Sequence, residues 1–213
     1  MESKIEYYEK SSPNFKLMEH YRSRIQEMEE KSSYGEKVAS KWSEILYKFL
    51  TKENYPVNHP IGQETFSLYA EYPAGVFEYA LDIDGAAELI KEKDIKPVKF
   101  SPARIIDSVD KGNINQDLER IKPNHKNPVM VLKSNYLTDN RPYCINGNHR
   151  IFEAYRNDNK QIEVFVFNEL EFIPFFYDAL SKATYFFEID YYNVLNDKRY
   201  FIDNEESAFA DKL

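Results

Sequence analysis

The five residues from Asn146 to Arg150 include types that commonly bind phosphate. Gly147 tolerates a positive φ and lets an anion approach the backbone closely. Arg150 can direct two parallel N–H donors at phosphate oxygens, and His149 adds another donor or a proton carrier. Together with Asn148, which lies between them, these residues form the candidate phosphate-binding set: Gly147, Asn148, His149 and Arg150.

The sequence around this loop predicts a strand, a turn and then a helix. The apolar run Tyr143–Ile145 is typical of a short strand, while Ile151, Ala154 and Tyr155 share one helical face. The N–H groups of the first helical turn lack intrahelical partners, and the helix dipole adds about half a positive charge there. This order therefore favours an anion at the loop.

Purely structural interpretations of the same residues stay open at this point. Asn146 followed by Gly147 is a common turn pair, and Arg150 could pair with a surface carboxylate. His149 could cap a helix or pack against its surroundings. The phosphate interpretation is favoured because the glycine, the helix start and the arginine coincide.

The elements that would position the loop are short strands alternating with helices. Predicted strands cover residues 98–100, 129–132, 143–145 and 162–167, and Asn115 is expected to cap a helix that runs to Arg120. Together with the helix after Arg150, these elements predict a small α/β module with a mixed sheet.

The part before this module is expected to be helical. Residues 13–31 place Met18, Tyr21, Ile25 and Met28 on one face, and Ser33 with Glu36 forms a capping box for a second helix that ends near Leu50. We therefore expect a helical hairpin in residues 1–60, which ends in a proline-containing loop.

The remaining residues are expected to form a connective segment and the domain that contains the α/β module. Residues 61–96 are expected to be connective, with a helix over residues 85–93 that Asp84 caps. Residues 97–213 hold the α/β module and an aromatic C-terminal segment, residues 170–195, which is expected to be helical at first and to complete the core. The expected fold class is α+β, with the N-terminal helical hairpin packed on the module.

The run Gly147–Arg150 resembles the ParB/sulfiredoxin-like superfamily. The resemblance extends to Ala154 and Tyr155 and to the strand that carries Ile162, Val164 and Val166, and it covers about 70 of the 213 residues. It is closest in motif to the nucleotide-binding N-terminal domain of ParB and to free-serine kinases. It implies an α/β fold that binds nucleotide phosphates on this loop, as a CTP-dependent DNA clamp in some members and as an ATP-dependent enzyme in others.

This chain differs from the family at several points, and these differences limit which of the family's activities the resemblance implies. Sulfiredoxins carry a catalytic thiol where this chain has Asn148, and Cys144 is expected to be a buried structural thiol. Partition proteins append DNA-binding and dimerisation domains, whereas 46 residues follow Phe167 here. Many related loops begin with Asp where this chain has Asn146, and an amide neither holds a metal nor accepts a proton well.

Composition restricts the expected partners. A net charge of −8 and a pI of about 5.2 disfavour DNA binding. A single cysteine excludes an intrachain disulfide framework, and without an apolar run of about 18 residues or a leader we expect a cytoplasmic protein with no membrane partner.

No site for a metal held by the protein alone is expected. The spacing of His20, His59 and His125 does not match a zinc site, and these histidines are expected at the surface or in loops. Asp82 and Asp84 do not continue into a calcium loop.

The functional expectation is a nucleotide-triphosphate-binding protein in which Mg²⁺ bridges the phosphates. The sequence leaves open whether it also acts as an ATP- or CTP-dependent hydrolase or as a small-molecule kinase, with Glu119 as base and His149 as a second catalytic residue. The alternative is a non-catalytic protein-interaction module that retains the fold. Its partner would bind the helical hairpin or the aromatic C-terminal segment.

Overall fold

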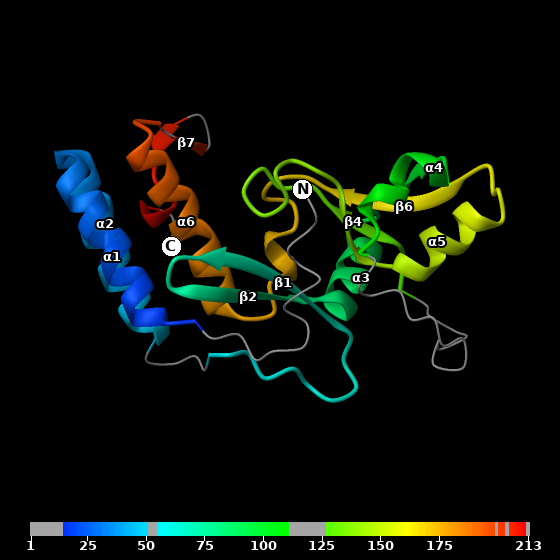
Figure 1. Cartoon of the computed structure of the whole chain (residues 1–213), viewed down its shortest axis with the longest axis horizontal. Coiled ribbons are helices and arrows are strands. Elements are labelled where there is room, and N and C mark those ends of the chain that lie inside the picture. Colours follow the sequence, from blue (N-terminus) through cyan, green and yellow to red (C-terminus); the bar gives the residue numbers. More distant parts are fainter. Residues whose placement is uncertain (1–14, 51–54, 111–126, 199, 203–204, 212–213) are drawn as a thin grey trace. The chain divides into compact units, whose positions relative to one another are not determined.

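The computed structural model describes residues 15–50, 55–110, 127–198, 200–202 and 205–211, without side-chain placement for residues 200–207. The chain is an α+β protein with an N-terminal helix pair, a two-stranded hairpin and a four-stranded mixed sheet (Figure 1). Its contacts form two compact units: a first unit of residues 59–68 and 81–175, and a second unit of residues 13–58, 69–80 and 176–213. No described helix is long and apolar enough to cross a membrane.

The sheet of the first unit has the strand order β3-β6-β4-β5. β3 (Val98–Phe100) pairs antiparallel with β6 (Ile162–Phe167), β6 pairs parallel with β4 (Met130–Leu132), and β4 pairs antiparallel with β5 (Tyr143–Asn146). The four predicted strands are thus confirmed to within one residue at each end. Apolar runs bounded by turn residues were sufficient to locate them.

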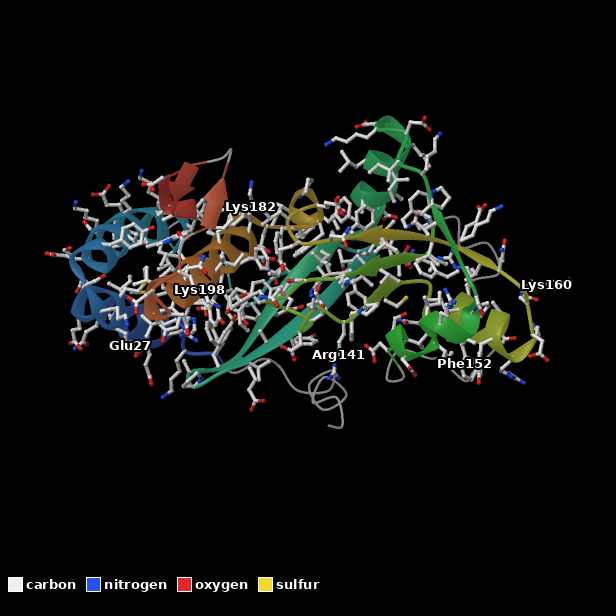
Figure 2. All side chains as sticks on the ribbon, turned by 90° about the horizontal axis from the view of Figure 1, so that it is seen from above. Glu27, Arg141, Phe152, Lys160, Lys182 and Lys198 are labelled. Atoms are coloured by element: carbon white, nitrogen blue, oxygen red, sulfur yellow. The ribbon has the colours of Figure 1, made fainter. Side chains whose placement is uncertain are left out.

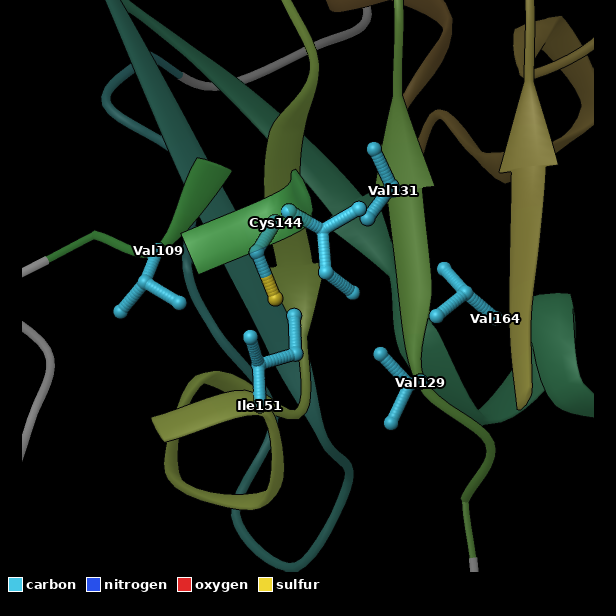
Figure 3. Packing of buried hydrophobic residues seen from close by; sticks show 7 residues of the cluster. Val109, Val129, Val131, Cys144, Ile151 and Val164 are labelled. Atoms are coloured by element: carbon cyan, nitrogen blue, oxygen red, sulfur yellow. The ribbon is translucent and has the colours of Figure 1, made fainter. Parts of the chain in front are cut away.

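A compact apolar cluster fills one face of this sheet. It packs the strands against α4 (Pro102–Ile105) and α5 (Asn148–Arg156), and Figure 3 shows Cys144 on β5 pointing toward Ile151 on α5. The buried members are Ile105, Val109, Val129, Val131, Cys144, Ile151 and Val164. The predicted burial of Cys144 is confirmed, and the cluster fixes α5 at the end of β5.

The other face of the sheet is covered by aromatic packing. Phe167 at the end of β6 points away from Val164, because neighbouring residues of a strand alternate between faces. Its ring packs edge-on against Phe175 of the 3-10 turn η5 (Ile173–Phe175), with the ring centroids 4.6 Å apart. All three residues of β4 are therefore buried, whereas on β6 this second face also carries the exposed Glu163.

Residues 61–96 contain more regular structure than the expected connective segment. They form a hairpin of β1 (Thr65–Tyr72) and β2 (Gly75–Asp82), followed by α3 (Ile83–Glu92). The predicted helix is confirmed but its predicted cap is wrong, since Asp82 and not Asp84 accepts the Gly85 N–H, at 2.8 Å. The carboxylate of Asp84 is thereby left for other contacts.

The second unit is built on three helices, α1 (Leu17–Lys31), α2 (Ser33–Leu50) and α6 (Ala179–Leu195). The predicted helix pair is confirmed. α2 begins after Ser32, whose hydroxyl accepts the Gly35 N–H at 3.0 Å, so the cap lies one residue before the predicted Ser33. The chain then forms β7 (Tyr200–Ile202), β8 (Glu205–Ser207) and the 3-10 turn η6 (Phe209–Asp211).

The aromatic helix α6 belongs with the helix pair. It packs against α1 and α2, with the Phe187 ring edge-on to Trp42 at a centroid distance of 5.5 Å. Residues 176–213 therefore belong to the second unit, whereas Phe172 and Phe175, which come earlier in the predicted aromatic segment, belong to the first. The predicted helix of this segment is present, but it begins at Ala179, after the 3-10 turn η5.

A buried polar network links α1 to α6. His20 and Glu188 are both buried, with Nε2 and Oε1 2.6 Å apart, and Arg24 donates to the same carboxylate at 2.9 Å. The expectation that His20 lies at the surface is wrong, because its partner is 168 residues away in the sequence. Glu27, on the exposed face of α1 (Figure 2), accepts a hydrogen bond from the Tyr191 hydroxyl at 2.5 Å.

Candidate functional site

The loop from β5 into α5 has the predicted strand–turn–helix geometry. β5 ends at Asn146, Gly147 has a φ of 97°, and Asn148 begins the helix. The first intrahelical bond runs from the Ile151 N–H to the Gly147 carbonyl at 3.1 Å. Gly147 has no side chain that could cap the helix, and no side chain caps the start of α5 in the described part of the chain.

Two constraints select glycine at residue 147. A φ of 97° is strained for any residue with a Cβ. A Cβ here would also lie 2.8 Å from Val129 Cγ2 and 3.0 Å from the Arg150 Nη2. The space beside Gly147 is thus filled by Val129, which directly precedes β4, and by the Arg150 side chain.

The guanidinium of Arg150 lies over this bend and is partly buried. It makes no hydrogen bond or ion pair with any residue that the structure describes, so the alternative of a surface carboxylate partner finds no support there. Burial lowers the pKa of the Arg150 guanidinium, while electrostatic interactions with Cys144 and Glu64 raise it. Arginine remains charged at neutral pH, so a partly desolvated cation faces the start of α5.

The side chain of Asn148 is turned inward. It is 7% exposed, and its Oδ1 accepts the backbone N–H of Asp110 at 3.0 Å. Asn148 therefore offers a ligand its backbone N–H, and its side chain fixes the loop to the segment that follows η2 (Ile106–Ser108). His149 follows on the same turn and is partly exposed.

Asn146 has a structural hydrogen bond of its own. Its buried side chain donates from Nδ2 to the Pro128 carbonyl at 2.8 Å. A carboxylate could not make this bond, since it has no donor when ionised. The amide at this position, which departs from the related loops, thus ties the end of β5 to the segment before β4.

A buried acid beside the loop was missed in the sequence. Asp110 is 7% exposed, and its Oδ2 accepts the Tyr143 hydroxyl at 2.8 Å. Asp110 thus bonds to the loop on both sides of Gly147, because its carboxylate accepts from Tyr143 and its N–H donates to Asn148. No sequence signal identified Asp110, because its contacts are with residues 33 and 38 positions away.

Two further carboxylates of the first unit share one amide. The Nδ2 of Asn127 donates to Glu64 Oε2 at 2.6 Å and to Asp84 Oδ1 at 2.8 Å. Asp84 Oδ2 also accepts the Glu64 N–H at 2.7 Å. Because the Glu64 charge acts on Arg150, this acidic group contributes to the electrostatics of the loop.

The predicted phosphate-binding residues thus lie together on one turn, while the predicted base, Glu119, lies outside the described residues. So do Asp117, the helix expected over residues 115–120, and His125. The chain that is described holds no group of three or more His, Cys, Asp or Glu residues able to bind a metal ion. Asp82, considered for a calcium loop, is the cap of α3.

Comparison with known proteins adds no family to this geometry. No family model, no curated protein and no solved structure matches the chain. The resemblance to the ParB/sulfiredoxin-like superfamily therefore stays a prediction, which rests on the residues of the loop and on the strands around it.

Proposed function

We propose that the chain is a nucleotide-triphosphate-binding protein of the ParB/sulfiredoxin-like fold, and that the turn from Gly147 to Arg150 holds the phosphates. One observation carries the proposal. The partly buried guanidinium of Arg150 has no partner in the described chain and lies at a glycine-capped helix start. A helix N-terminus with an arginine beside it combines backbone N–H donors with positive charge, and this combination favours phosphate oxygens.

The proposed ligand is a nucleotide with Mg²⁺. Mg²⁺ is commonly held by substrate phosphates, water and one or two carboxylates and does not need a complete protein cage. The net charge of −8, with Glu64 acting on Arg150, opposes a bare triphosphate. A metal ion that reduces the ligand's charge favours binding.

A catalytic version of this proposal is hydrolysis of the nucleotide or phosphate transfer to a small acceptor. Arg150 would then stabilise the charge that develops on the transferred group. His149, on the same turn, would move a proton. Glu119 stays the proposed base on sequence grounds alone.

Calorimetric titration with ATP, CTP and GTP in Mg²⁺ tests the proposal. We expect the wild type to bind at least one of the three and Arg150→Ala to bind it at least tenfold more weakly, the loss of about 1.4 kcal/mol or more. Arg156→Ala is the matched control, because Arg156 lies on the same helix, is exposed, and pairs with Glu153 at 3.2 Å. Binding to none of the three, or equal binding by both variants, would contradict the proposal.

A non-catalytic interaction module is the second candidate, and Asn146 favours it. The loop has an amide with a structural bond where related loops have an acid. The exposed face of α1, with Glu19, Glu27, Glu29 and Glu30, would be its docking surface. The aromatic segment is a weaker choice, since Tyr185 and Phe187 are fully buried. A phosphate-release assay on any nucleotide that binds separates this candidate from an enzyme.

A further inference from the structure

Asp190 is a buried carboxylate on α6 that no cation neutralises. Its side chain belongs to a residue that is 2% exposed, and it accepts three N–H groups, from Phe209 at 2.9 Å, Ala210 at 3.0 Å and the Trp42 indole at 2.8 Å. No Lys, Arg or His in the described chain forms an ion pair with it. The carboxylate thus joins the C-terminal turn η6 to both α2 and α6.

The charged groups around Asp190 are few and unevenly distributed. Asp211 on η6 is the acidic neighbour, and it is paired with Lys41 of α2. On α6 itself, Glu188 lies two residues earlier and faces His20 and Arg24 of α1. The cations near Asp190 are therefore engaged by other carboxylates.

Burial dominates the ionisation of this group. It raises the pKa of Asp190 from 3.8 to about 6, although the three N–H donors act in the opposite direction. The geometry explains the direction, because neutral dipoles offset only part of the cost of removing a carboxylate from water. A protonated carboxyl is cheaper to bury in this place.

We propose that docking of the C-terminal turn, Ala208–Asp211, onto α2 and α6 takes up a proton at Asp190, so that the turn is held more tightly at mildly acidic pH than at neutral pH. Phe209 and Ala210 are buried in the docked state, and the Phe209 ring stacks on Phe186 at 4.5 Å. These apolar contacts hold the turn at all pH values, and the proton modulates their effect.

The sign and size of the effect follow from linkage. A carboxyl in water has the ordinary pKa of 3.8, whereas Asp190 in the docked state has a pKa of about 6. The docked state therefore binds the proton better and is favoured as pH falls. Between about pH 7.5 and about pH 5, the docking constant should rise about tenfold.

The single tryptophan gives a direct reading of this proton. Trp42 is the one Trp of the chain, and its indole donates to the Asp190 carboxylate. We expect the Trp fluorescence of the whole chain to titrate with a midpoint near pH 6, to lose that transition in Asp190→Asn, and to shift to lower pH in Asp211→Asn. A wild-type signal that is flat from about pH 4.5 to about pH 8 would overturn the proposal.

Amide hydrogen exchange tests the docking itself. After correction for intrinsic exchange, the protection of the Phe209 and Ala210 amides should be about tenfold greater at about pH 5 than at about pH 7.5 in the wild type. In Asp190→Asn it should be the same at both. Protection that decreases on acidification, or that changes equally in both proteins, would contradict proton-linked docking.

Discussion

Gly147 illustrates how one residue can serve both the fold and a binding site. Its positive φ turns the chain from β5 into α5, and its missing side chain leaves room for Val129 and the Arg150 guanidinium. The sequence predicted the conformational role from the Asn-Gly pair and the helix that follows. It could not predict the crowding, because that depends on where Val129 lies in the folded chain.

Gly147→Ala should destabilise the protein by about 3 kcal/mol, because a Cβ adds left-handed backbone strain and a steric overlap. Gly62→Ala is the matched control, since Gly62 has a φ of 90° with nothing within 4 Å of its Cβ position. That variant should lose about 1 kcal/mol. Urea unfolding of both variants measures the difference, and equal losses would contradict the crowding at Gly147.

The two asparagines that flank the glycine hold the loop in place. Asn146 donates to the Pro128 carbonyl, and Asn148 accepts the Asp110 N–H. The sequence predicts a phosphate-binding role for Asn148 and, at Asn146, the loss of the acid found in related loops. Both hydrogen-bond partners are distant in sequence, which is why these structural roles were not predicted.

Asn146→Asp should destabilise the protein by about 2 kcal/mol at neutral pH, because a buried carboxylate would face the Pro128 carbonyl without a donor. Asn148→Asp keeps an acceptor for the Asp110 N–H and is the comparison variant. Thermal unfolding followed by circular dichroism compares the two. A larger loss in the Asn148 variant would contradict the assigned donor and acceptor roles.

For the helices and strands, sequence patterns predicted where each element lies better than they predicted which elements pack together. The strands β3 and β6 were predicted with their observed ends because short apolar runs stand between turn residues. The hairpin β1–β2 was missed because β2 is buried from Phe77 to Leu81, including Glu78, and shows no alternation. α6 is likewise buried around most of its surface, so no periodic face indicated which unit it joins.

The close packing of α1, α2 and α6 depends on Gly35. A Cβ at this residue would overlap the Met28 carbonyl oxygen and lie 2.9 Å from Val194 Cγ1. Gly35→Ala should therefore destabilise the second unit by about 2 kcal/mol, despite the better helix propensity of alanine. Ser40→Ala, at an exposed position of the same helix, should change stability by less than about 0.5 kcal/mol. Denaturant unfolding of both variants shows whether close packing at Gly35 or the helix propensity of alanine has the larger effect on the free energy of unfolding.

For the molecule as a whole, the net negative charge of the chain is compatible with a small nucleotide ligand but disfavours binding of a polyanion such as DNA. The chain has 36 acidic and 28 basic side chains, and the exposed face of α1 is acidic. A nucleotide with Mg²⁺ needs one local positive site, whereas duplex DNA needs a continuous basic surface. The same loop can thus hold a nucleotide in a protein that does not bind DNA.

An electrophoretic shift assay with duplex DNA at low salt should show no complex, both without nucleotide and with ATP, CTP or GTP and Mg²⁺. Low salt strengthens phosphate contacts and is therefore the condition most favourable to binding. A complex that forms only with a nucleotide would show that the charge argument fails and that the loop acts as a DNA-linked switch.

The most direct measurement is an amide NMR titration of the whole chain with Mg²⁺ and each nucleotide. We expect the largest shift changes at the amides of Gly147, Asn148, His149 and Arg150. Arg150→Ala should greatly reduce these changes, whereas Arg156→Ala should not. Shift changes confined to other elements, or none with any of the three nucleotides, would contradict a phosphate site at the start of α5.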